Sequence, residues 1–409
     1  MARHRVKGLG GILLGGALLR IFLLAAIPAG EAPDERAHAA FARYLAEEGR
    51  LPVQTERTGE GDRYEFYQPP LFYLLAAPLH AAAGGGDRGL YAARLLNAAL
   101  SLLAVAAAAR FAETCAPARP DLRSGVAAFL AFHPGLAANG STANNDALLV
   151  LLSTVAFARL GRAVREPALR PRDGFCLALL LGLALLTKIS GGVLLPIVAF
   201  GLVLARPGLR GIAEAGGVVA GAALLASPWY LRNQAVYGGL VPLEIANVPW
   251  ADRPPAAEAA VWTAGYAART FWVALGRHNE VEVSALRPLL YGLGALTLFA
   301  FAGWVRRGAG SRNRGERPLA LAAWAGLVLL AAFTGSFGWR YRQAQGRFLF
   351  PLLAPLATAA VTLLLERAGP VRARRVPAFV GGLLLALLGA ELLLAFVPKY
   401  YPSLAPWTR

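Results

Sequence analysis

Three residues with catalytic potential stand together just after the first apolar run of the chain. In the segment "PDERAH", Asp34 and His38 are four residues apart, and Glu35 lies three residues before His38. Residues three or four apart share one face of a helix. Carboxylates and an imidazole on one face could remove a proton from a nucleophile or bind a metal ion. A structural alternative is that Asp34 caps the helix and Glu35 complements its dipole.

A further acidic candidate is Asp146 in "ANNDALL", where a short polar loop meets the next apolar run. It too could be a helix cap. If it emerges on the same side as Asp34, two carboxylates from separate loops could hold a base, an acceptor hydroxyl or a metal ion. The candidate metal ligands are Glu35, His38 and Asp146.

Several basic residues are placed where topology alone does not require them. Lys188 in "LLTKISGG" lies between two apolar runs, and a lysine that snorkels to the interface is the alternative there. Arginine suits phosphate because its planar group donates two parallel hydrogen bonds. We predict that Lys188, Arg232, Arg342 and Arg347 bind a phosphate group of the substrate, and that Tyr67, Gln68, Asn233 and Gln345 line the substrate pocket.

Carboxylates beside cations are suited to attack on a phosphorylated substrate. Asp34 would take the proton of the nucleophile, and the cations would neutralise charge on a leaving phosphate. The sequence has no Walker-type loop and no strand followed by G-x-G-x-x-G. We therefore expect a lipid-linked phosphate donor that enters from the bilayer. No cofactor is required by this chemistry, and a divalent metal is compatible with it.

Composition indicates the class of protein that positions these residues. The 409 residues are 56% hydrophobic and only 16% charged, against roughly 25% charged in soluble domains. Apolar runs of about 20 residues recur along the chain, which predicts an all-α polytopic membrane protein. The net charge of +17 comes from short Arg clusters between these runs, so we assign it to topology and lipid headgroups and not to nucleic acid.

The positive-inside rule gives an orientation. Arg3, Arg5 and Lys7 place the N-terminus in the cytoplasm, so the first span, 8–27, delivers residues 28–68 to the outer side. That segment holds nine acids and five arginines, as expected for a translocated loop. We predict an inner-membrane, multi-pass protein with an extracytoplasmic active site.

The apolar piece from Leu71 to Ala83 decides the topology of everything after it. With about 13 residues and Pro78 in the middle, it is too short to span, so we predict an interfacial helix. Only this choice places the later Arg clusters inside. About eleven spans result, with the remaining ones near 90–110, 124–138, 146–161, 174–187, 189–205, 211–230, 285–305, 318–337, 347–366 and 376–397.

The predicted organisation is a single integral membrane domain over 1–409. Its large outer loops are 28–89, with juxtamembrane helices, and 231–284. We expect no soluble C-terminal domain, since only a short tail follows the last predicted span.

The order of these motifs resembles the GT-C membrane glycosyltransferases, the broad group that includes protein O-mannosyltransferases and the aminoarabinose transferase of lipid A. The motifs that carry the resemblance are "PDERAH", "YQPPLFYLL", "ANNDALL", "PWYLRNQAVYG" and "QGRFLFPLL". The motifs are short, but they occur in the family's order along nearly the whole chain. Similar uncharacterised bacterial membrane proteins carry a "QGR(Y/F)" motif.

The resemblance implies a polyprenyl-phosphate sugar donor, an outward active site and inversion at the anomeric carbon. Asp34 matches the catalytic acid of the family's first outer loop, Glu35 its neighbour, and Asp146 the acid of the second loop. Arg347 would lie near the donor phosphate. The acceptor would be a glycan, lipid or protein of a bacterial cell envelope.

Two other functions remain open. A transporter or flippase of a lipid-linked glycan is the main alternative, although the charges crowd one outer face and no inverted repeat is evident. A metal-dependent hydrolase built on Glu35, His38 and Asp146 ranks third, because the chain has five histidines and no H-E-x-x-H pattern.

Overall fold

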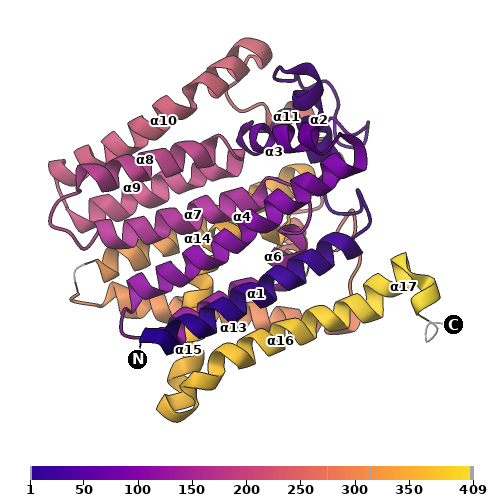
Figure 1. Cartoon of the computed structure of the whole chain (residues 1–409). Coiled ribbons are helices and arrows are strands. Elements are labelled where there is room, and N and C mark those ends of the chain that lie inside the picture. The colour runs from indigo at the N-terminus through magenta and orange to yellow at the C-terminus, as the bar shows by residue number, and fades with distance from the viewer. Residues whose placement is uncertain (1, 274, 314, 406–409) are drawn as a thin grey trace.

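The computed structural model describes residues 2–273, 275–313 and 315–405. Within these ranges the regular structure is helical, apart from isolated bridges at Thr58–Gly61 and Leu275–Val281. Long helices run side by side along the molecule (Figure 1). The predicted all-α fold class is confirmed.

The helices that match the predicted spans follow them in order along the chain. Their bounds are α1 (Ala2–Ala26), α4 (Gly86–Cys115), α5 (Pro120–Phe132), α7 (Asp146–Ala163), α8 (Pro171–Leu185), α9 (Leu194–Ala205), α10 (Leu209–Tyr237), α13 (Arg287–Ala309), α14 (Glu316–Tyr341), α15 (Leu353–Arg372) and α16 (Val376–Glu391). Within the described residues, six helical stretches are long and apolar enough to cross a membrane by length and composition. The chain is therefore an integral, multi-pass membrane protein, and the predicted number of about eleven spans stays a prediction.

Small residues let the long helices approach each other closely. In α4 the buried face carries Ala93, Ala104, Ala108 and Ala112, and α4 packs against α5 and α7. In lipid, helices associate through such close packing because hydrocarbon tails are as apolar as the side chains.

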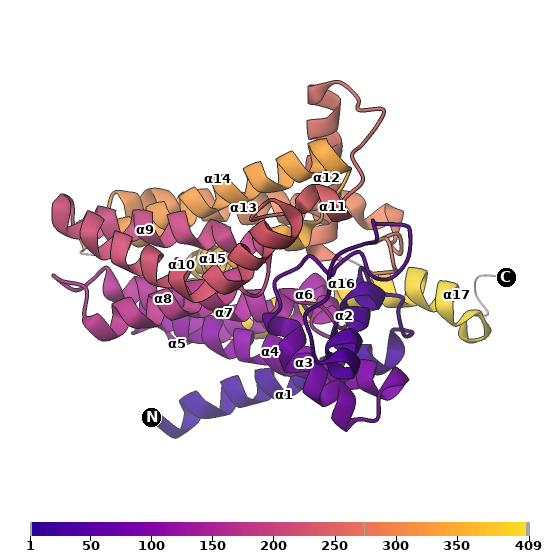
Figure 2. The ribbon, with the colours of Figure 1, turned by 90° about the horizontal axis from the view of Figure 1, so that it is seen from above.

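Four helices that lie outside the predicted spans gather at one end of the bundle. These are α2 (Glu35–Glu48), α3 (Leu71–Ala82), α11 (Leu243–Ala246) and α12 (Ala256–Trp272). They lie at the end that also holds α17 (Val397–Tyr400), away from the start of α1 (Figures 1 and 2). The 12 residues of α3 give it a length of about 18 Å, well short of the hydrocarbon thickness of about 30 Å, as expected for an interfacial helix.

Breaks in the helices place polar residues at the same end. The third predicted span, 124–138, is interrupted at His133 and continues as α6 (Pro134–Asn139), while η1 (Ile189–Val193) follows Lys188. The predicted span at 347 begins as the 3₁₀ helix η3 (Gly346–Leu352). Gly346 is required here, because a β-carbon would collide with the α12 backbone at Ala267 and Phe271. Because Gly346 has no β-carbon, the chain can approach α12 closely, and the next residue, Arg347, is buried in the bundle.

The remaining elements are small. The 3₁₀ helices η2 (Ser284–Leu286), η4 (Ala373–Arg375) and η6 (Pro402–Leu404), the π-helical turn η5 (Leu392–Phe396) and α17 (Val397–Tyr400) complete the chain as described.

Candidate active site

The centre of the site is a buried cluster of four charges drawn from four segments. Lys188 Nζ donates to Asp146 Oδ1 at 2.5 Å. The Arg347 guanidinium spans two carboxylates: one of its terminal nitrogens pairs with Asp34, and the other lies 3.2 Å from Asp146 Oδ2. Lys188, Asp146 and Arg347 are each less than a tenth exposed. Carboxylates from two loops therefore meet cations from two later segments, as predicted.

Asp34 reaches this cluster because its backbone turns the wrong way for a helix cap. It precedes α2 with φ 59° and ψ 4°, and its side chain makes no capping hydrogen bond. Instead it pairs with Arg347, and Tyr64 Oη donates to its Oδ1 at 3.1 Å. The capping alternative for Asp34 is therefore wrong.

Electrostatics keep Asp34 ionised. Burial alone would raise its pKa, but the charge of Arg347 lowers the pKa of this carboxyl below its usual value. Its side chain is 23% exposed, more than that of Arg347 at 6%. An ionised and partly accessible carboxylate is suited to accept a proton.

His38 lies one helical turn after Asp34 on α2. Its Nδ1 lies 2.7 Å from Tyr73 Oη, and the two rings are stacked. Burial lowers the pKa of this imidazole to about 3, even though Asp34 acts in the opposite direction. His38 is thus a neutral ring that contributes polarity without charge.

The cluster opens into a small cavity of about 40 Å³. This volume holds one or two water molecules, so a sugar phosphate requires it to widen. One wall is polar and the other is aromatic and aliphatic, with Phe333, Phe337 and Phe348 beside Leu243. The polar lining includes Asp34, His38, Glu65, Tyr67, Gln68, Lys188, Gln343, Gln345 and Arg347.

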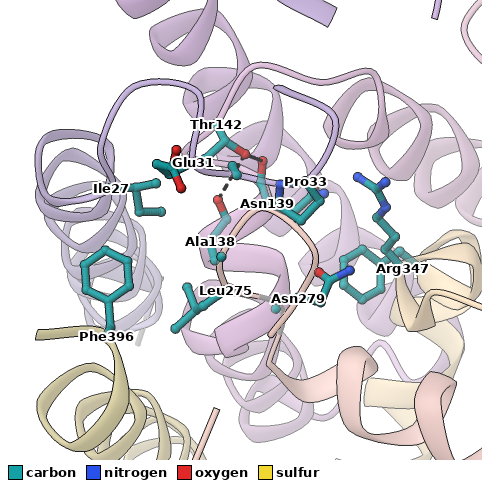
Figure 3. Close-up of a pocket in the computed structure, with 14 residues that line it drawn as sticks. Ile27, Glu31, Pro33, Ala138, Asn139, Thr142, Leu275, Asn279, Arg347 and Phe396 are labelled. Carbon is teal, nitrogen blue, oxygen red and sulfur yellow. Dashed lines mark hydrogen bonds between the residues drawn. The ribbon is translucent and has the colours of Figure 1, made fainter. Parts of the chain in front are cut away.

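Arg347 also borders a second cavity of about 20 Å³ on its other side. Figure 3 shows Arg347 at the edge of this space, with Asn279 beside it and Asn139 across from it. Asn139 Nδ2 donates to Asp146 Oδ2 at 3.3 Å, which links this side to the charge cluster.

Some predicted site residues face elsewhere. Glu35 is fully buried and turned away from the cavity: it accepts hydrogen bonds from Arg94 and from the backbone nitrogens of Gly30 and Ala143. A catalytic or metal-binding Glu35 is therefore incompatible with the geometry. The reason is local, since the left-handed turn at Asp34 sends the next side chain in the opposite direction.

Two arginines predicted to bind phosphate are also held outside the cavity. Arg232 donates to Pro52 O and lies over the Trp229 ring, 4.9 Å from its centroid. Arg342 lies 5.1 Å from the Trp250 centroid. Cation–π contacts satisfy both groups. The predicted pocket residue Asn233 instead contacts Arg232 and Leu240 O, so these three assignments are corrected.

Glu65 and Tyr73 belong to the site, but the sequence alone does not assign them to it. Glu65 stands in an irregular segment, where no periodicity predicts the direction of a side chain. The signal available was a single acid within the aromatic-rich stretch "YEFYQPPLFY".

The predicted metal ligands do not come together. Within the described ranges, no group of three or more His, Cys, Asp and Glu side chains could hold a metal ion. Asp146 is committed to Lys188 and Arg347, and Glu35 to Arg94. The described residues do not fit a metal site.

Comparison with known proteins supports the motif resemblance. The profile of the dolichyl-phosphate-mannose-protein mannosyltransferase family matches residues 67–231. Among solved structures, ArnT from Cupriavidus metallidurans bound to undecaprenyl phosphate has a TM-score of 0.57 at 16% identity, covering 97% of this chain and 74% of that one. The chain has the GT-C fold. The resemblance predicted from the motifs is thereby confirmed.

A more distant match shows the same architecture. The oligosaccharyltransferase AglB from Archaeoglobus fulgidus, in complex with an inhibitory peptide and a dolichol-phosphate, has a TM-score of 0.55 at 11% identity. The match covers 96% of this chain and 56% of AglB, so this GT-C chain spans about half of that protein. A comparison with curated protein sequences finds no significant match.

Proposed function

We propose that this GT-C chain is an inverting glycosyltransferase that moves a sugar from a polyprenyl-phosphate-linked donor to a cell-envelope acceptor on the outer face of the membrane. The observation that carries the proposal is the buried guanidinium of Arg347, which pairs with Asp34 and Asp146 together. This arrangement puts a proton acceptor next to a phosphate-binding cation.

The reaction is a single displacement. The acceptor hydroxyl oxygen attacks the anomeric carbon and passes its proton to Asp34. The bond from that carbon to the phosphate oxygen breaks, and the phosphate leaves with the electron pair. Arg347 and Lys188 neutralise the charge that develops on it. Attack opposite the leaving group inverts the anomeric centre.

The ion pairs suggest how binding of the donor would activate Asp34 as the base. Without a donor, Lys188 and Arg347 balance the charges of Asp146 and Asp34. An entering phosphate competes for Arg347 and so loosens its pair with Asp34. The freed carboxylate is then available as the base, which couples donor binding to activation.

The aromatic wall suggests the route of the lipid. Phe333 and Phe337 belong to α14, a candidate span, while Phe348 faces them from η3. An isoprenoid chain that slides along this wall brings its phosphate to Lys188 and Arg347. Lipid phosphates named in the ArnT and AglB structures support this donor class.

The test is Asp34→Asn in purified protein supplied with radiolabelled undecaprenyl-phosphate sugars and envelope acceptors. Loss of the base lowers transfer by about 10²- to 10⁴-fold, while undecaprenyl phosphate still binds. Transfer at the wild-type rate by the variant would remove Asp34 from the chemistry. Movement of intact donor across vesicles without transfer would instead favour a flippase.

A further inference from the structure

Glu65 is a buried acid that the proposed reaction does not use. It lies in the segment between α2 and α3, is 9% exposed, and lines the same cavity as Asp34, Lys188 and Arg347. No described residue donates a hydrogen bond to its Oε2. Buried polar atoms are nearly always hydrogen-bonded, so an atom without a partner beside a cavity points to a ligand.

The charges around Glu65 are already matched without it. Lys188 pairs with Asp146, and Arg347 pairs with both Asp34 and Asp146. A third carboxylate therefore has no cation of its own among the described groups that face the cavity. An ionised Glu65 would also repel an incoming phosphate. The titratable and charged groups around it are Asp34 and His38 of α2, Tyr64 and Tyr67 of its own segment, Tyr73 of α3, Asp146 of α7, Lys188 before η1 and Arg347 of η3.

Burial and charge give Glu65 the opposite protonation to Asp34. Burial first, and then the charge of Asp34, raises the pKa of the Glu65 carboxyl to about 8. Arg347 lowers that of Asp34. Two acids in one cavity with pKa values pushed apart are a recurrent sign of different chemical roles.

We propose that Glu65 binds the donor phosphate as a neutral carboxylic acid, its hydroxyl donating a hydrogen bond to a phosphate oxygen. This proposal rests on the proposed glycosyl transfer. Phosphate oxygens only accept hydrogen bonds, so an acid that keeps its proton complements them and an ionised one does not. The proton stays on Glu65, because the phosphodiester of the donor is a far weaker base than the Glu65 carboxylate. The monoester that transfer leaves behind, with a second pKa near 6, is also the weaker base.

The experiment measures binding of undecaprenyl phosphate, the common product of such donors whatever the sugar. The full chain in lipid nanodiscs is compared at pH 7 and pH 9 as wild type, Glu65→Gln and Glu65→Ala. Wild type binds about tenfold more weakly at pH 9, as Glu65 loses its proton through about pH 8. Glu65→Gln keeps a donor that does not titrate, so its affinity stays near wild type at pH 7 and changes little at pH 9. Glu65→Ala binds about ten- to hundredfold more weakly at pH 7.

The matched control is Glu47→Gln on the exposed side of α2, which keeps the wild-type pH response. Glu65→Gln binding as weakly as Glu65→Ala at pH 7, as expected if an ionised carboxylate recognises a sugar amine or hydroxyl, would overturn the proposal. The proposal would also be overturned if Glu65→Gln lost as much affinity between pH 7 and pH 9 as wild type does. Failure of wild type to bind at any pH would count against the proposed function itself, so the two failures are distinguishable.

Discussion

At the scale of single residues, backbone strain and charge act together at Asp34. Its left-handed conformation costs an acid residue on the order of 1 kcal/mol, and surrounding structure must hold it there. The ion pair with Arg347 and the hydrogen bond from Tyr64 supply that support. The same turn frees the carboxylate from capping α2, which is what makes it available to a substrate.

Arg347→Lys tests whether geometry or charge matters at this position. Lysine keeps the positive charge but cannot contact Asp34 and Asp146 through two fixed nitrogens. We expect transfer to fall about 100-fold. The control is Arg342→Lys, which alters an arginine stacked on Trp250 outside the cavity and should leave the transfer rate near wild type. Equal losses in both variants would contradict a special role for Arg347.

Glu65 also predicts how stability depends on pH. Its pKa rises from 4.5 to about 8 on folding, so the unfolded chain releases this proton first. The contribution is fully present below about pH 4.5 and is lost as pH rises to about 8. Melting temperatures measured from pH 5 to pH 9 should fall less steeply in Glu65→Gln than in wild type. Parallel curves for the two proteins would show that Glu65 titrates normally.

Much of the site could be predicted from residue type and topology, but side-chain direction could not. The sequence identifies Asp34, Lys188 and Arg347 because a charged residue of either sign is unusual at the boundary of an apolar span. Glu35 was misplaced because one left-handed residue reverses the helical face, and the motif does not encode that turn. Arg232 was misplaced because its guanidinium donates to Pro52 O, a partner far away in sequence, while it lies over the rings of Trp229 and Tyr237.

At the scale of elements, a buried ion pair fixes α2 to the bundle. Arg94 of α4 donates to both Glu35 oxygens, at 2.8 and 2.6 Å, and also to the carbonyl oxygens of Leu24, Ile27 and Pro28. Both side chains are fully buried. The end of α1, the start of α2 and α4 are thereby locked together, which sets the position of Asp34.

Glu35→Gln should therefore damage the fold more than the chemistry. Removing one charge from a fully buried pair costs about 3–5 kcal/mol, because the other charge is left uncompensated. A large fall in melting temperature is expected, with the folded fraction keeping measurable transfer. Glu31→Gln, which breaks a partly exposed pair with Arg36, should cost at most about 1 kcal/mol. A stable but inactive Glu35→Gln would restore a catalytic role.

Hydrophobic periods predicted the helices well and their interruptions poorly. The apolar runs gave the order of the long helices and the short α3. The 3₁₀ start at Gly346 depends on close approach of α12, and α12 itself lies in what was predicted as a loop. These details arise from tertiary packing, which a single sequence does not display.

At the scale of the whole molecule, the segments that carry chemistry lie at one end. Figures 1 and 2 show α2, α3 and α11 at the end opposite the start of α1. At this end of the packed bundle, charged residues from distant parts of the sequence converge. We propose that this end is extracytoplasmic, which follows from the charge bias and from the acids of residues 28–68.

Cysteine accessibility tests this orientation. In a background lacking Cys115 and Cys176, single cysteines are introduced as Thr55→Cys in the segment between α2 and α3 and as Arg312→Cys between α13 and α14, both at exposed positions. A membrane-impermeant maleimide should label Thr55→Cys in intact cells and Arg312→Cys only after permeabilisation. The two positions belong to opposite ends of the bundle, so labelling of both from one side would refute the threading. Labelling of Arg312→Cys alone in intact cells would invert it, and would place the charge cluster in the cytoplasm, where a nucleotide-linked donor becomes accessible.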